Sequence, residues 1–156
     1  MNKGKVNAAL GDERSESAWL PLLELAEIEV TSQTSANPID GALDLAGTTE
    51  WHAAGPGKQV VRLTFEPPQA VQLVRVVVEE RDRARTQEMV LRVALTPDGP
   101  WRQIVRQQFN FSPSGCTREE EDFRIERASI TGLELTIIPD IRGGDSRASL
   151  RQLRVA

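Results

Sequence analysis

The stretch TTEWHAAGPG, residues 48–57, contains the only histidine of the chain, His52, directly after Trp51. An imidazole can donate a hydrogen bond to a polar ligand and accept one from it, so His52 is a candidate for ligand contact at the mouth of a site. The alternative is structural: His52 is then only the polar neighbour of a core tryptophan at a strand end. The sequence leaves both interpretations open.

No other residues form a recognisable catalytic set. An enzyme site needs a positioned nucleophile, an acid–base pair or a metal with an open position. The lone histidine has no nucleophilic partner evident in the sequence, there is no His/Cys cluster, and no glycine-rich phosphate loop precedes a helix. Cys116 is the only cysteine, which fits a reducing compartment. We therefore expect a protein that is not an enzyme and has no catalytic residues.

Length and charge restrict the fold and the partners. The 156 residues are 39% hydrophobic, which is enough for one domain with its own core. With 19 basic and 23 acidic residues the net charge is −4, which disfavours nucleic acid as the main partner. The apolar segments are far shorter than the roughly 20 residues that cross a bilayer, and no apolar stretch follows the early lysines. We expect no membrane association and a cytoplasmic location.

The elements that position these residues show a period of two from residue 27 onward. Ile28 and Val30 alternate with polar neighbours, and similar alternation returns in residues 61–65, 91–95 and 133–137. Residues 71–78 are almost continuously apolar, which is typical of a central strand covered on both faces. Turn signals separate the runs, among them Asp40-Gly41 and residues 66–68. This pattern predicts an all-β fold, an antiparallel β-sandwich or barrel.

Two segments fall outside the alternation, and the first is polar up to about Ser17. Residues 1–26 are predicted to be an N-terminal extension, partly docked onto the domain of residues 27–156. Within the extension, Ser17 is predicted to cap a helix of one or two turns near Pro21. The acidic residues 119–122 are predicted to form a solvated loop leading into a strand rather than a metal site.

The order of several motifs resembles a known superfamily. The motifs, all within residues 27–156, are SANPIDG, TTEW, VVRLTF with a proline turn, VQLVRVVV, VLRVALTPDGPW and ASLRQLRV. Their order is similar to that of the galactose-binding-like superfamily, specifically the discoidin or coagulation factor 5/8 type C branch, which includes many bacterial carbohydrate-binding modules. The resemblance implies a jelly-roll β-sandwich.

The resemblance also implies a structural calcium ion. Asp40 and Thr49 match ligands of the family, Asp44 is a further candidate, and Gln152 stands where the family commonly has a glutamate. Calcium binds about six to eight oxygen atoms, which turns of this kind supply. The neutral amide of Gln152 is expected to weaken the site. Alternatively, Asp40 only shapes a turn and Thr49 makes a local hydrogen bond.

Tryptophans carry a further part of the resemblance. Trp51 and Trp101 match two recurring tryptophans of the family, so both are predicted to pack in the core. Truncation of either to alanine is then expected to cost about 3–5 kcal/mol. Trp19 is predicted to anchor the N-terminal segment on the sandwich.

By resemblance, the protein is expected to bind a galactose-like carbohydrate through loops at one end of the sandwich. His52 and Arg81 match a histidine and a loop arginine that hydrogen-bond galactose in some members, and Arg85 is a second donor. Imidazole and guanidinium groups offer fixed donors to vicinal hydroxyls. Alternatively, the loop of residues 79–88 is a solvated hairpin, and the chain is an intracellular protein–protein interaction or scaffold domain of the same fold. The oligomeric state stays open.

Overall fold

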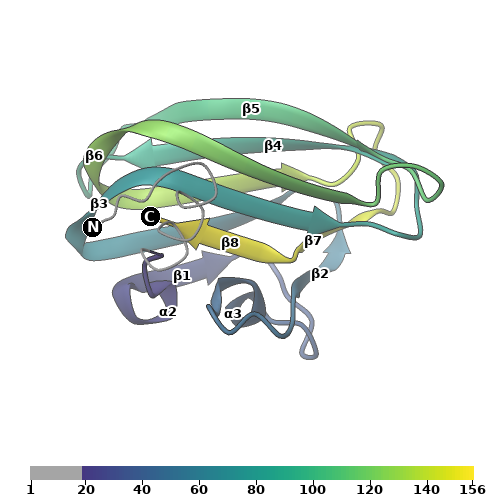
Figure 1. Cartoon of the computed structure of the whole chain (residues 1–156), viewed down its shortest axis with the longest axis horizontal. Helices are drawn as coiled ribbons and strands as arrows, with labels where there is room; N and C mark the ends of the chain where they lie inside the picture. The colour runs from purple at the N-terminus through teal and green to yellow at the C-terminus, as the bar shows by residue number, and fades with distance from the viewer. Residues whose placement is uncertain (1–18) are drawn as a thin grey trace, which may run out of the picture.

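A computed structural model describes residues 19–156, which form a mostly antiparallel β structure with two short helices (Figure 1). In chain order the elements are α2 (Leu22–Leu25), β1 (Ala26–Val30), α3 (Ile39–Leu43), β2 (Trp51–Pro56), β3 (Gln59–Glu79), β4 (Arg85–Ala94), β5 (Trp101–Phe111), β6 (Arg118–Ile138), β7 (Arg147–Leu150) and β8 (Gln152–Val155). Ser17, predicted to cap a helix, lies outside the described residues. None of the helices in the described part of the chain is long or apolar enough to cross a membrane.

Two long strands, β3 and β6, connect the layers of the sandwich. They pair antiparallel along most of their length. The first half of β3 also pairs with β1, and its second half pairs with β8. The second half of β6 pairs with β4, which carries β5 at the edge. Because each long strand contributes to two groups of neighbours, the sheet folds over a single hydrophobic cluster. The predicted antiparallel β-sandwich is confirmed.

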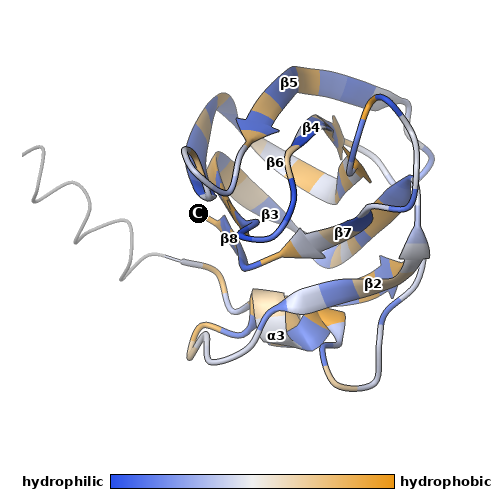
Figure 2. Cartoon of the chain, turned by 90° about the vertical axis from the view of Figure 1, so that its right-hand side faces the viewer, coloured by the Kyte–Doolittle hydropathy of each residue, from blue (hydrophilic) through white to orange (hydrophobic). Residues whose placement is uncertain are grey.

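A separate pair of strands closes one side of the sandwich. β2 and β7 pair antiparallel, with His52 opposite Ser149. Figure 2 shows these two strands beside each other, with α3 next to β2. Along β2, buried and exposed residues alternate from Trp51 to Ala54. This alternation decides which side chains of β2 face outward, and therefore which can meet a ligand.

Two predicted loops are in fact strand. Residues 66–68, predicted to be a proline turn, continue β3, with a shift in register between Thr64 and Gln69. Proline cannot donate a ladder hydrogen bond, and an irregularity in the pairing accommodates it. The acidic residues 119–122 lie in β6, where they pair with residues 75–78 of β3, rather than in a loop. Asp122 is paired with Arg75 across the two strands.

The two tryptophans predicted to pack in the core differ in burial. Trp51 is fully buried in the core, as predicted, and its indole N–H donates to the Ser32 carbonyl at 2.9 Å. Trp101, also predicted to pack in the core, is 36% exposed, so that prediction is wrong. Trp101 lies on the edge strand β5, and its ring rests over Gly132, where a Cβ atom would be only 2.7 Å from the indole. Arg62 stacks on the same ring at 5.4 Å.

The packed part of the chain begins before the predicted boundary at residue 27. Leu22 of α2 is fully buried in the core cluster. The Leu20 N–H donates to the Val155 carbonyl of β8 at 2.8 Å, and Arg75 stacks on the Trp19 ring at 5.2 Å. Residues 19–26 therefore pack against the sandwich, and Trp19 takes part in this packing through Arg75.

Candidate ligand-binding site

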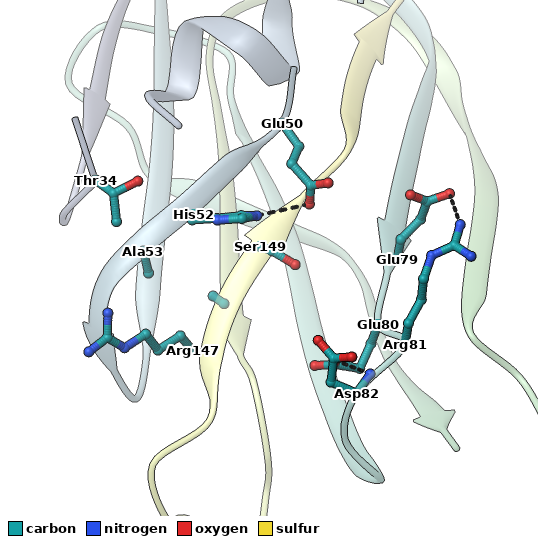
Figure 3. A pocket seen from close by; sticks show the side chains of 11 residues that line it. Thr34, Glu50, His52, Ala53, Glu79, Glu80, Arg81, Asp82, Arg147 and Ser149 are labelled. Carbon is teal, nitrogen blue, oxygen red and sulfur yellow. Dashed lines mark hydrogen bonds and ion pairs between the residues drawn. The ribbon is translucent and has the colours of Figure 1, made fainter. Parts of the chain in front are cut away.

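A pocket of about 350 Å³ opens where β2, β7 and the loop after β3 meet (Figure 3). Its lining is polar and comes from segments far apart in the sequence. The lining residues are Thr34, Glu50, His52, Ala53, Glu79, Glu80, Arg81, Asp82, Arg147, Ala148 and Ser149. The pocket thus brings together His52 and Arg81, two of the three residues predicted to contact a ligand.

His52 faces this pocket because of the alternation along β2. Trp51 and Ala53 point into the core, whereas the His52 side chain is 46% exposed. One edge of β2 at His52 faces β7, and the other is held by backbone hydrogen bonds. The His52 N–H donates to the Asn37 carbonyl and the His52 carbonyl accepts from the Thr34 N–H, both at 3.0 Å. The imidazole Nε2 lies 3.3 Å from a carboxylate oxygen of Glu50. The prediction that His52 and Trp51 point to opposite sides is confirmed.

Arg81 enters the pocket from the loop between β3 and β4. Its side chain is 70% exposed, and its guanidinium lies 3.5 Å from the Glu79 carboxylate, which also accepts a hydrogen bond from Arg118. Figure 3 shows Arg81 turned toward Glu79 and His52 turned toward Glu50. His52 therefore pairs with Glu50, and Arg81 pairs with Glu79, which it shares with Arg118. Both basic residues line the same cavity from different segments.

Arg85, predicted to be a second ligand donor, does not line the pocket. Its side chain is fully buried, and its guanidinium donates to Glu80, Gln87 and the Pro139 carbonyl at 2.7–2.8 Å. The same guanidinium stacks on the ring of Phe111 at 4.9 Å. Arg85 is the first residue of β4 and its side chain points inward, which removes it from the ligand-exposed loop.

Through Glu80, however, Arg85 shapes the pocket. One carboxylate oxygen of Glu80 accepts from Arg85, and the other accepts from the Asp82 N–H at 3.1 Å. Burial by itself would raise the pKa of Glu80, but the hydrogen bonds from Arg85 and Asp82 and the charge of Arg85 together lower it. Glu80 is therefore ionised at neutral pH and holds the backbone of the loop that carries Arg81.

Several lining residues were not singled out from the sequence. Glu50 lies two residues before His52, and Arg147 and Ser149 lie on the same outward face of β7. The alternation in the RASL segment, where Ala148 and Leu150 are buried, is a sequence signal that could have identified this face. No local sequence pattern indicates that β7 pairs with β2.

The four predicted calcium ligands come from α3, from the segment between α3 and β2, and from the start of β8. Asp40 and Thr49 are exposed, and Asp40 belongs to α3 rather than to a turn. The Asp44 carboxylate accepts from the Ala46 N–H at 2.9 Å. In residues 19–156, no group of three or more His, Cys, Asp or Glu side chains could hold a metal ion.

Comparison with known proteins gives the class of fold. No family model matches the chain, and no curated protein matches it. It is similar to the family 32 carbohydrate-binding module of Clostridium perfringens NanJ, solved with galactose, with a TM-score of 0.65 and 14% identity over 88% of this chain and 96% of that one. It is also similar to the module CBM32-5 of C. perfringens GH89, solved with GalNAc-β-1,3-galactose, with a TM-score of 0.63 and 18% identity over 88% of this chain and 99% of that one.

A third similar structure is CBM32-3 from a family 31 glycoside hydrolase of C. perfringens, with a TM-score of 0.64 and 16% identity over 91% of this chain and 96% of that one. These likenesses cover nearly the whole of each module. The chain therefore has the galactose-binding-like, discoidin-type β-sandwich fold that the motif order implied.

Proposed function

We propose that this chain is a non-catalytic carbohydrate-binding module that binds a neutral, galactose-like sugar in the pocket between His52 and Arg81. The observation that carries the proposal is that both residues line one open polar cavity. Solved modules of the same fold include ones determined with galactose and with a GalNAc-galactose disaccharide, which supports a sugar as the ligand class.

The chemistry of the lining suits a polyhydroxylated ligand. His52 and Arg81 supply donors, the carboxylates of Glu50 and Asp82 supply acceptors, and the Ser149 hydroxyl can do either. Sugar hydroxyls are both donors and acceptors, so mixed groups of this kind can satisfy several of them at once. Hydrogen bonds that involve charged groups are the stronger ones.

Charge in the pocket favours a neutral sugar over an acidic one. The lining contains four carboxylates, Glu50, Glu79, Glu80 and Asp82, and two arginines, Arg81 and Arg147. A uronate would add a further negative charge near Asp82 and Glu50. We therefore expect galacturonate to bind more weakly than galactose, and the difference to shrink at high salt.

A second hollow of about 540 Å³ shares Glu80, Asp82 and Arg147 with the first. It also includes Arg83 and Asp145, which are hydrogen-bonded to each other. Because the two hollows are adjacent and share these residues, a second sugar unit can lie in the second hollow beside the first. A disaccharide is therefore expected to bind more tightly than a monosaccharide.

The test is an NMR titration of the protein with galactose, N-acetylgalactosamine and galacturonate. The pocket lining holds no tryptophan or phenylalanine, so no aromatic platform adds affinity. At about 0.3 kcal/mol for each of about twelve non-hydrogen atoms, the expected Kd of a monosaccharide is on the order of 1 mM. Shifts should concentrate on β2, β7 and the loop of residues 80–84.

Substitutions then locate the site. His52→Ala and Arg81→Ala should each weaken galactose binding about five- to tenfold, since each removes about one polar contact from an exposed side chain. Arg102→Ala, an exposed arginine of β5 outside the pocket, is the matched control and should bind as the native protein does. Absence of binding at about 20 mM of either neutral sugar, or full binding by both pocket variants, would refute the proposal.

A further inference from the structure

Arg154 of β8 is a buried charge that the proposed sugar site does not use. The residue is 4% exposed. Its Nη1 donates to the Ala42 carbonyl at 2.9 Å and to the Leu153 carbonyl at 3.2 Å, and its Nη2 donates to the Asp44 carbonyl at 2.9 Å. A guanidinium is always charged in proteins, so a fixed positive charge lies among backbone oxygens.

Two of those oxygens, the carbonyls of Ala42 and Asp44, belong to the end of α3 and the residue that follows it. The last carbonyls of a helix have no partner within the helix and need a donor from elsewhere. Here α3 has no basic residue in its own last turn, and Arg154 provides the donors from the last strand. Helix α3 and β8 are thereby joined across more than 100 residues of sequence.

The segment after α3 closes over the guanidinium. Gly47 has a φ of +64°, and a Cβ atom there would lie 3.3 Å from Nη2 of Arg154 and 3.7 Å from Nε2 of Gln152. The loop therefore folds tightly against the arginine, at a position where a side chain would be strained. The negative charge of Asp44 acts on Arg154 as well, although burial is the larger effect and lowers the pKa of Arg154.

These residues do not fit a calcium ion. Calcium needs about six to eight oxygens at about 2.3–2.6 Å, and the carbonyls of Ala42 and Asp44 already accept N–H groups at 2.9 Å. The Asp44 carboxylate accepts from the Ala46 backbone. A divalent cation in this loop would also lie next to the positive charge of Arg154, which repels it.

We propose that the guanidinium of Arg154 takes the place of the structural calcium ion, holding the segment of residues 42–47 against β8 with a cation that belongs to the chain. The loop then needs no metal, and the stability of the protein is independent of calcium. This inference does not depend on sugar binding, because it concerns carbonyls outside the pocket lining.

The first experiment uses the native protein after treatment with a chelator. Thermal unfolding is measured with EDTA and with about 2 mM CaCl2, and the two Tm values should agree within error. A bound structural calcium at about 100 times its Kd would raise Tm by about 5–10 °C. A rise of that size would overturn the proposal.

The second experiment removes the charge. Arg154→Met keeps much of the apolar stem but leaves buried carbonyls without donors, so Tm should fall by about 10 °C. Arg102→Met, an exposed arginine on β5, is the control and should leave Tm nearly unchanged. An Arg154→Met protein as stable as the native one would contradict the proposed role.

A milder variant keeps the test decisive if Arg154→Met does not fold. Arg154→Lys retains one positive charge but cannot place two donor groups on the carbonyls of Ala42 and Asp44 at once. Hydrogen exchange of residues 42–49 should then become faster, while exchange in β4 stays as in the native protein. Unchanged exchange in residues 42–49 would overturn the proposal.

Discussion

A short series of hydrogen bonds between side chains and the backbone, here called the relay, helps to determine the shape of the pocket. Arg85 is buried and holds Glu80, and Glu80 holds the Asp82 N–H in the loop that presents Arg81. Arg85 is therefore a positioning residue: it affects a ligand only through Glu80. The sequence correctly predicted that Arg85 lies near the site, but it predicted an exposed side chain where the structure has a buried one. A shift of one residue in the start of a strand reverses whether a side chain points into the core or to the surface.

Replacement of Arg85 by methionine should destabilise the protein by about 3 kcal/mol at pH 7, because Glu80 loses its buried partner. The folded-state pKa of Glu80 is lowered, so this pairing stabilises the fold above the unfolded-state pKa and is lost as pH falls through the folded-state value. The difference in unfolding free energy between native and variant protein should therefore be largest above about pH 5 and shrink in acid. Urea denaturation across pH measures it.

The control for that experiment is Arg83→Met. Arg83 lies two residues before Arg85, in the loop between β3 and β4, is about half exposed and pairs with the exposed Asp145. An exposed pair of this kind contributes little, so this variant should unfold like the native protein at every pH. If Arg85→Met showed the same small, pH-independent change in unfolding free energy as Arg83→Met, the contact between Arg85 and Glu80 would not stabilise the fold.

Strands β5 and β6 are linked by a contact between a tryptophan and a glycine. Trp101 rests over Gly132, and Arg62, itself paired with Glu134, stacks on the ring. The indole covers a place on the sheet face that lacks a side chain, which is why a large aromatic side chain is tolerated on the outside of an edge strand. Such cross-strand contacts are the units that stabilise a sheet.

A double-mutant cycle tests this contact. Gly132→Val should cost about 1–3 kcal/mol in the native background, since the new side chain collides with the indole. In a Trp101→Ala background the same change should cost little, because valine suits a strand better than glycine does. Equal costs in both backgrounds, measured by urea denaturation, would show that the ring does not lie over Gly132.

At the scale of the whole molecule, one hydrophobic cluster takes in both halves of β3 and β6, β2, β8 and the short helices. Trp51 is the largest fully buried side chain, and it lies immediately before the pocket residue His52. The core and the candidate site are therefore adjacent along a single strand, and the position of His52 depends on the packing of Trp51.

Trp51→Ala should cost about 3–5 kcal/mol of unfolding free energy, in one cooperative transition. Trp101→Ala should cost clearly less, because more than a third of that side chain is already exposed. Urea denaturation followed by both fluorescence and circular dichroism measures both variants. Similar costs for the two tryptophans would contradict the placement of Trp101 on the outer face.

The amino-acid sequence by itself determined the class of fold and the direction of many side chains. Alternation with a period of two predicted the strands, the apolar run of residues 71–78 predicted a central strand, and the same alternation turned His52 away from Trp51. These features are local: each depends only on which residues follow one another in a strand. The order of the motifs then indicated the galactose-binding-like sandwich.

The tertiary structure alone decided which distant groups meet. It joined β2 to β7, so that Arg147 and Ser149 line the same pocket as His52, and it continued β3 through the two prolines. It also placed Arg154 on the carbonyls of Ala42 and Asp44, among residues that the sequence suggested as calcium ligands. Such contacts depend on strand register and loop closure over long separations, and no local pattern encodes them.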